Sequence, residues 1–238
     1  MRLTIRQRAS WLAHLFKASS QQHHRELRGL FAAHVPRDAV VVDVGAHAGQ
    51  FSKLFARMAP AGHVYAFEPS AYARSIMAPA LRFNRIRNVT LTPAGLSDSA
   101  GRLTLHTPLK RSSALGYGVA HLGAPGDDGK TVDQTVELTT LDAFANLKGL
   151  ARLDLVKADI EGWEMRALKG GQATLGRFRP VLYLEVDDVL LSRAGDSPGA
   201  LFDWLGALGY RGFSTPDLRP APRWAGAGDY LFTTAQER

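Results

Sequence analysis

A run of β-branched residues over 39–44 turns into a helix through a short glycine turn, and this constrains the fold more than any other feature. The run reads AVVVDV, which is typical of a parallel strand buried on both faces. The turn at 45–49 reads GAHAG, and residues 50–58 then place apolar side chains at helical spacing. A buried strand followed directly by a helix predicts a parallel sheet covered by helices, with a ligand site at its carboxyl edge.

The rest of the chain continues this alternation, with one interruption. Further strands are expected over 63–67, 89–96, 153–159 and 180–186, with helices between them, and two short closing strands over 210–214 and 229–233. Residues 102–107 and 131–138 predict a β-pair around a glycine-rich loop, and we expect the 107–131 loop to build the substrate pocket. Pro79 is expected to kink or end the helix that follows Ser70.

Composition excludes several classes of protein. The chain of 238 residues is 45% hydrophobic, which argues against disorder, and it contains no cysteine, which excludes disulfides, thiolate metal sites and a cysteine nucleophile. Residues 1–35 hold six basic residues and one acidic residue, and so supply most of the net charge of +7. Because the remaining body is nearly neutral, we expect no nucleic-acid partner.

We divide the sequence into a basic helical N-terminal extension, residues 1–35, and a main domain, residues 36–238. The extension has one apolar stripe, formed by Trp11, Leu12, Leu15 and Phe16. It could lie weakly on an anionic membrane surface, or pack across the main domain or a second subunit, and we favour packing because four apolar residues bury little area. No secretory signal is recognisable, so we expect a cytoplasmic protein; the oligomeric state stays open.

The glycine turn lacks both the G-x-G-x-x-G and the G-x-x-x-x-G-K patterns that bind diphosphates. It can therefore accept a bulky group without phosphate, with Asp43 placed to orient the turn or hold a cation. Glu68 ends the second strand, where a carboxylate can accept both hydroxyls of a ribose. Asp98 ends the expected third strand, where it can accept from an adenine amino group. An adenosine cofactor without a diphosphate fits these features, and S-adenosylmethionine is such a cofactor.

Five motifs in order resemble the FkbM family of methyltransferases: VVDVGA at 41–46, YAFEP at 65–69, LSD at 96–98, TLD at 140–142 and VKADIEG at 156–162. The resemblance implies an α/β class I methyltransferase (Rossmann-like) fold, with about seven strands of which the last is antiparallel. It also implies O-methylation of a small-molecule or glycan acceptor, on a sugar or polyketide-type hydroxyl. The implied residues for S-adenosylmethionine are Asp43, Gly45, Ala46, His47, Gly49, Glu68, Pro69, Ser97, Asp98 and Asp159.

Lys157, Asp159 and Glu161 are the candidate catalytic residues. Their i, i+2, i+4 spacing places all three on one side of a strand. We expect Asp159 to act as a general base or to hold the methionine amino group, with Glu161 supporting it and Lys157 tuning its charge. A structural ion pair is the alternative for this cluster. Its carboxylates are too few for a divalent metal, so no metal is expected.

Two other classes of function stay open. An NAD-dependent oxidoreductase would need diphosphate contacts that the turn lacks. A non-catalytic module that keeps the cofactor fold and recruits a partner through its basic arm would not need the acids that are present. Glu185, at the end of the fifth strand, is expected either to contact substrate or to lie at an exposed edge.

Overall fold

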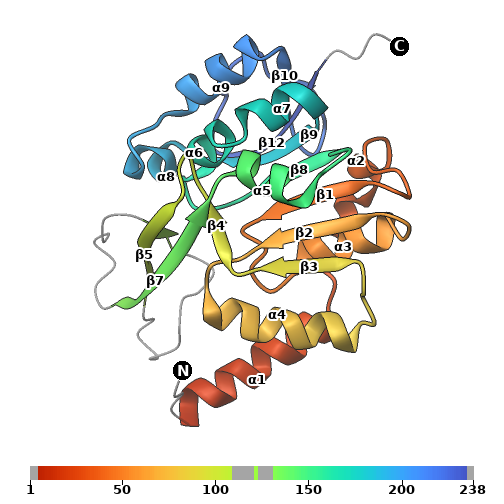
Figure 1. Ribbon diagram of the computed structural model, residues 1–238, viewed down its shortest axis with the longest axis vertical. Coiled ribbons are helices and arrows are strands. Elements are labelled where there is room, and N and C mark those ends of the chain that lie inside the picture. Colours follow the sequence, from red (N-terminus) through yellow and green to blue (C-terminus); the bar gives the residue numbers. More distant parts are fainter. Residues whose placement is uncertain (1–4, 109–120, 123–130, 235–238) are drawn as a thin grey trace.

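The computed structural model describes residues 5–108, 121–122 and 131–234. A central eight-stranded sheet has helices on both faces, and a smaller four-stranded sheet lies beside it (Figure 1). The strands of the central sheet, in spatial order, are β11 (Arg219–Pro220), β10 (Tyr210–Ser214), β12 (Gly228–Thr234), β9 (Val181–Val186), β8 (Leu155–Ala158), β1 (Val40–Val44), β2 (His63–Phe67) and β3 (Val89–Thr92). The smaller sheet contains β4 (Ala94–Leu96), β7 (Thr131–Thr139), β5 (Gly101–Pro108) and β6 (His121–Leu122).

Within the described ranges, nine α-helices and one short 3-10 helix lie before and between the strands. They are α1 (Ile5–Ser20), the 3-10 turn Arg25–Leu27, α2 (Arg28–Ala32), α3 (Gln50–Met58), α4 (Ala71–Phe83), α5 (Leu141–Lys148), α6 (Glu164–Lys169), α7 (Gln172–Phe178), α8 (Asp188–Arg193) and α9 (Pro198–Ala207). Two of these helices begin at a serine cap: the side chain of Ser70 accepts from the N–H of Ala73, and that of Ser197 from the N–H of Ala200.

The pairing directions confirm an open, mostly parallel sheet. β1 pairs in parallel with β2 and β8, β2 with β3, and β8 with β9. β12, the last strand, is antiparallel to both β9 and β10. The carboxyl ends of β1, β2 and β8 therefore meet at one edge, where the expected ligand site lies.

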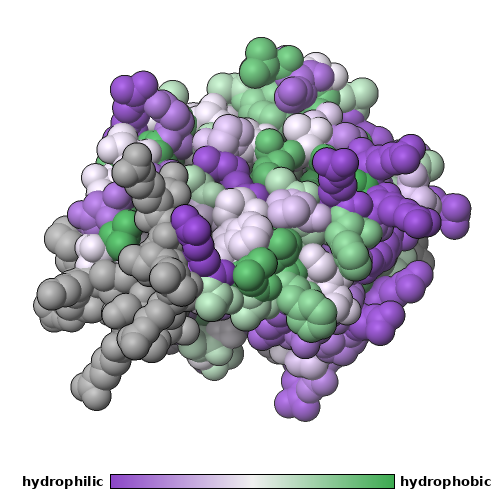
Figure 2. Space-filling model, turned by 90° about the horizontal axis from the view of Figure 1, so that it is seen from below, coloured by the Kyte–Doolittle hydropathy of each residue, from purple (hydrophilic) through white to green (hydrophobic). Residues whose placement is uncertain are grey.

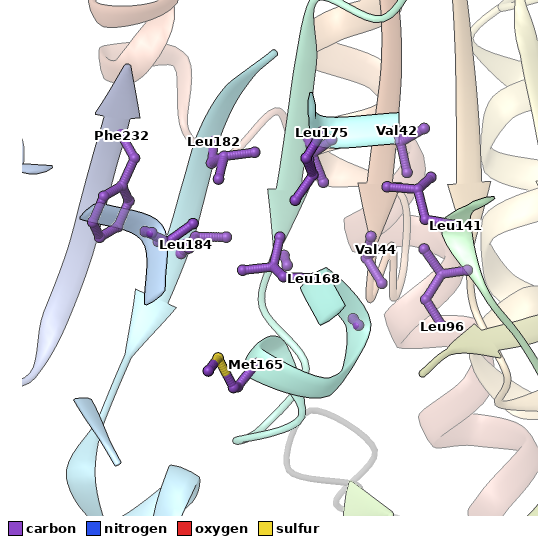
Figure 3. Close-up of a cluster of buried hydrophobic side chains, with 14 of the residues drawn as sticks. Val42, Val44, Leu96, Leu141, Met165, Leu168, Leu175, Leu182, Leu184 and Phe232 are labelled. Atoms are coloured by element: carbon purple, nitrogen blue, oxygen red, sulfur yellow. The ribbon is translucent and has the colours of Figure 1, made fainter. Parts of the chain in front are cut away.

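Alternation along the strands divides the core between the two faces of the sheet. Val42 and Val44 of β1 pack against α5, α6 and α7, in the cluster drawn in Figure 3. Val41, between them, packs on the opposite face against Phe51 and Phe55 of α3. A strand buried on both faces explains why its sequence is continuously apolar.

One prediction about local structure is wrong. The expected third strand, 89–96, is divided: β3 belongs to the central sheet and β4 to the smaller one. Pro93 separates them, because proline has no N–H to donate to a strand ladder. The smaller sheet extends the expected β-pair, since β5 and β7 pair antiparallel and β4 and β6 add to its two sides.

Pro79 does not end α4, which continues to Phe83 with Ile76, Met77 and Ala80 buried.

The N-terminal extension packs against the main domain. α1 lies along α4 (Figure 1), and Trp11 and Leu15 contact its buried cluster, whereas Leu12 and Phe16, the other half of the expected stripe, are exposed. Further along, the fully buried ring of Phe31 lies 5.0 Å from the rings of both Phe55 and Tyr183. No helix in the described parts of the chain is long and apolar enough to cross a membrane.

Candidate functional site

A cavity of about 220 Å³ opens at the carboxyl ends of β1, β2 and β8. Its lining combines the glycine turn, the end of β2, the segment after β8, and side chains from α3 and the small sheet. The lining residues are His24, Val44, Gly45, Ala46, His47, Gln50, Phe51, Phe67, Glu68, Pro69, Gly95, Leu96, Leu105, Lys157, Asp159, Ile160 and Glu161. The structure thus brings together eight of the predicted site residues.

The glycine turn needs its first glycine for two reasons. Gly45 has a φ of +72°, in the left-handed region, and a Cβ at this position would lie 2.1 Å from the carbonyl oxygen of Asp159. The turn therefore packs directly against the segment that follows β8. This close approach fixes one wall of the cavity relative to the other.

Glu68 is buried, with 6% of its surface exposed, and lines the cavity. Its Oε2 accepts the backbone N–H of His47 at 2.7 Å, and its Oε1 accepts that of Ser70 at 2.8 Å. Burial raises the pKa of this carboxyl, although both backbone bonds oppose the rise. A carboxylate has about four acceptor positions, so about two remain for hydroxyl groups of a ligand.

Lys157 is buried in the cavity wall among opposite charges. Its Nζ lies 3.5 Å from Oδ1 of Asp43 and 3.6 Å from Oδ2 of Asp159, and it donates to the carbonyl oxygens of Val44 and Gly45. Burial acts to lower the pKa of Lys157, but Asp159 and Asp43 raise it above its usual value. Lys157 therefore stays charged and joins β1, the glycine turn and Asp159.

Asp159 and two neighbouring carboxyl groups, Glu161 and Glu185, differ in their proton affinity. Burial acts to raise the pKa of Asp159, but Lys157 and a hydrogen bond with Glu185 bring it below its usual value. Burial and the nearby Asp159 raise the pKa of Glu185 to about 8 and that of Glu161 to about 7. Near neutral pH, Asp159 is therefore ionised while Glu185 holds a proton.

This difference predicts a pH-dependent effect of Glu185→Gln on stability. The ordinary pKa of this carboxyl is 4.5, and in the folded state it is about 8. Between these two pH values the folded state holds a proton that the unfolded state has released, so the free energy of unfolding falls as the pH rises. The glutamine variant lacks this loss, so its free energy of unfolding should rise relative to wild type across that range. Urea unfolding at about pH 5 and about pH 9 measures the difference. A difference between the variant and wild type that does not change with pH would contradict this prediction.

Four predicted cofactor residues lie outside the cavity wall. Asp43 is fully buried and accepts a 2.5 Å hydrogen bond from Ser52. Its other carboxylate oxygen pairs with Lys157 on the side away from the cavity lining. Gly49 begins α3, where a Cβ would meet Met77. Ser97 accepts from Nε1 of Trp163, and Asp98 lies 3.4 Å from Arg166.

Asp98 lies outside the cavity lining. It follows β4 in the smaller sheet, so its side chain is directed to the α6 side and not to the cavity. Gly95 and Leu96 of the same strand take its place in the lining. The expectation that Lys157, Asp159 and Glu161 share one side of a strand is wrong. The strand β8 stops at Ala158, and Glu161 has a φ of +57° in the following turn. The parts of the 107–131 loop at 109–120 and 123–130 lie outside the described residues.

His24 also lines the cavity, although no motif in the sequence marks it as a site residue. Its ring stacks on Phe51, with centroids 4.2 Å apart and planes 14° from parallel. Lys53 donates to the carbonyl oxygens of Ala18 and Gln21, which holds the preceding segment against α3. Burial lowers the pKa of His24, so the ring is mainly neutral at pH 7. No local pattern indicates this contact, because it joins residues 27 positions apart.

Across the part of the chain that the structure describes, no group of three or more His, Cys, Asp or Glu side chains could hold a metal ion.

The sequence model described as "Methyltransferase FkbM domain" matches residues 43–211. The chain is 31% identical over 161 residues to "Methyltransferase sdnD" of Sordaria araneosa, which covers 58% of this chain and 62% of that protein. It is 27% identical over 185 residues to "2-O-methyltransferase NoeI" of Sinorhizobium fredii, covering 71% of each. The chain thus spans less than two thirds of the length of sdnD.

Among solved structures, a Streptococcus mutans protein in complex with SAH (S-adenosylhomocysteine) shares the fold. The two chains superpose with a TM-score of 0.50 at 11% identity, over 89% of this chain and 96% of the other. This likeness and the strand order confirm the class I fold that the sequence resemblance implied.

Proposed function

This chain belongs to the FkbM methyltransferase family, and from that premise we propose that it uses S-adenosylmethionine to methylate a hydroxyl group of a small molecule or glycan. The observation that carries the proposal is Glu68, a buried carboxylate that faces the cavity with acceptor positions left over. The relative named as a 2-O-methyltransferase supports oxygen as the methylated atom. A sugar or polyketide-type hydroxyl is the proposed acceptor.

The residues present fit this cofactor in their chemistry. Glu68 would accept the ribose hydroxyls, and the glycine turn would allow the cofactor to approach the backbone of Gly45. Gly95 and Leu96 lie beside Glu68 in the lining and would contact the adenine. When bound, S-adenosylmethionine supplies a methyl group on a positively charged sulfur. The carboxylates of Asp159 and Glu68 suit that charge.

Asp159 is the proposed proton acceptor. A hydroxyl is a poor nucleophile while protonated, so a carboxylate that takes its proton as the oxygen–carbon bond forms would speed the transfer. Asp159 lines the cavity with 46% of its side chain exposed, and Lys157 keeps it ionised. Glu161 lines the same wall, and its pKa of about 7 allows it to relay the proton. The alternative role for Asp159 is to hold the methionine amino group.

Family membership argues against the NAD-dependent oxidoreductase. The glycine turn supports the same conclusion, because it has no second glycine at the position where a diphosphate would touch the backbone. A non-catalytic module would bind cofactor without transferring a methyl group, and turnover therefore separates it from the proposal.

Calorimetric titration tests the cofactor assignment. We expect S-adenosylmethionine and S-adenosylhomocysteine each to bind one site per chain, and NAD to give no binding heat. Binding of NAD alone would overturn the proposal. Transfer of labelled methyl from S-adenosylmethionine to a panel of sugars and glycans then tests the acceptor class.

A further inference from the structure

The outer face of α1 and α4 exposes large apolar side chains. The inner sides of these helices are joined by hydrogen bonds such as that from Nε1 of Trp11 to Oγ of Ser75, at 2.9 Å. On the outer side, Leu12, Phe16 and Phe83 expose 59%, 72% and 72% of their surfaces. Seen from below, apolar side chains gather near the middle of this face, with hydrophilic ones beside them (Figure 2). We call these three residues the apolar patch.

The same face is positively charged. Neither α1 nor α4 contains an acidic residue. Arg8, Lys17, Arg82 and Arg85 are exposed on these helices and the turn after α4. Because no carboxylate of either helix offsets these charges, the face attracts anions.

A groove of about 370 Å³ adjoins the patch and adds three arginines, Arg25, Arg28 and Arg57. None of its lining residues is acidic. Arg57 donates to the amide oxygens of Gln22 and Asn84, each at 2.6 Å, so its partners orient the guanidinium without neutralising it. The groove also includes Ser19, Ser20 and Asn84, at the ends of α1 and α4 where Phe16 and Phe83 lie. We call this the arginine groove.

We propose that the apolar patch and the arginine groove together bind the surface of an anionic phospholipid membrane. Leu12, Phe16 and Phe83 would enter the boundary between headgroups and acyl chains, and the groove would bind a phosphodiester headgroup. Guanidinium groups suit phosphate oxygens because of their planar set of donors. Three apolar side chains give weak, reversible binding that depends on the added charge.

Two other partners fit the observations less well. In a symmetric dimer through this face, each subunit would present the same basic residues to its partner, and like charges would repel. A nucleic acid would use the arginines but would leave the exposed rings of Phe16 and Phe83 without a specific role. The membrane proposal does not depend on the methyl acceptor.

Sedimentation with lipid vesicles tests the proposal on the full chain. We expect binding to phosphatidylcholine vesicles that contain about 30% phosphatidylglycerol, little binding to phosphatidylcholine alone, and weaker binding as salt rises above roughly 0.1 M. Replacing Leu12, Phe16 and Phe83 together by serine should weaken binding by about tenfold or more. The matched control, Leu147→Ser with Val189→Ser, removes apolar residues that are 82% and 63% exposed elsewhere and should leave it unchanged.

Charge reversal tests the groove. Arg25→Glu with Arg28→Glu should weaken vesicle binding by about tenfold or more, whereas the pair Arg211→Glu with Arg223→Glu, also exposed, should change it little. All these positions are at the surface, and thermal melting checks that each variant is folded.

Four results would overturn the proposal. They are no vesicle binding, equal binding to neutral vesicles, a dimer that the serine variant dissociates, and binding of inorganic phosphate or a short RNA by a chain that binds no vesicles.

Discussion

Replacing Asp159 by asparagine is expected to slow methyl transfer by about 10²–10⁴-fold, the usual contribution of a general base. Asparagine keeps the shape of the side chain but cannot take the hydroxyl proton. Because Glu68 and the glycine turn are unchanged, the affinity for S-adenosylhomocysteine should stay within a few-fold of wild type. Turnover is measured with labelled S-adenosylmethionine and an accepted hydroxyl, and affinity by calorimetry.

The two proposed roles of Asp159 give different results. A general base lowers turnover, whereas a residue that holds the methionine amino group mainly weakens cofactor binding. Asp203→Asn, on the exposed side of α9, is the matched control and should change neither. Wild-type turnover and affinity in Asp159→Asn would contradict both roles and leave Asp159 as part of a structural ion pair.

Replacing Lys157 by methionine is expected to lower the free energy of unfolding by about 3–5 kcal/mol, the usual loss when one partner of a buried ion pair is removed. Lys157 is 2% exposed, and its Nζ lies 3.5 Å from the fully buried Asp43. Without the cation, Asp43 keeps only its bond from Ser52 and must be protonated or remain as an unpaired buried charge. Urea denaturation measures the loss.

The exposed Lys148→Met serves as the control and should change stability by less than about 0.5 kcal/mol. Adding Asp43→Asn to Lys157→Met should recover part of the loss, because the unpaired charge is then gone. A loss below about 1 kcal/mol in Lys157→Met, with no coupling to Asp43→Asn, would show that the pair contributes little.

Features that depend on a short stretch of chain could be predicted from the sequence. The buried strand over 39–44, its glycine turn and the following helix follow from β-branched composition and spacing, which act locally. The position of Glu68 in the cavity lining could be predicted because parallel strands all end at one edge. The positions of Lys157 and Asp159 in the lining could be predicted for the same reason.

Features that depend on contacts between residues far apart in the sequence could not be predicted from it. The sequence predicts one strand over 89–96 with Asp98 just after its end, but the transfer of β4, beyond Pro93, to another sheet depends on pairing with β7, some 40 positions later. His24 enters the cavity through Phe51 and the hydrogen bonds of Lys53, which no local periodicity encodes. The fully buried Phe31 could not be told from a surface residue, since its partners Phe55 and Tyr183 belong to separate elements.

The affinity of Glu68→Ala for S-adenosylhomocysteine tests most directly whether the cavity holds the ribose of an adenosine cofactor. Charge-assisted hydrogen bonds contribute roughly 1.5–3 kcal/mol each, so calorimetry should show affinity reduced by about tenfold or more. The exposed Glu137→Ala is the control, and thermal melting without ligand checks that the variant folds, since Glu68 also accepts from His47 and Ser70. An affinity equal to wild type in folded Glu68→Ala would contradict the assignment.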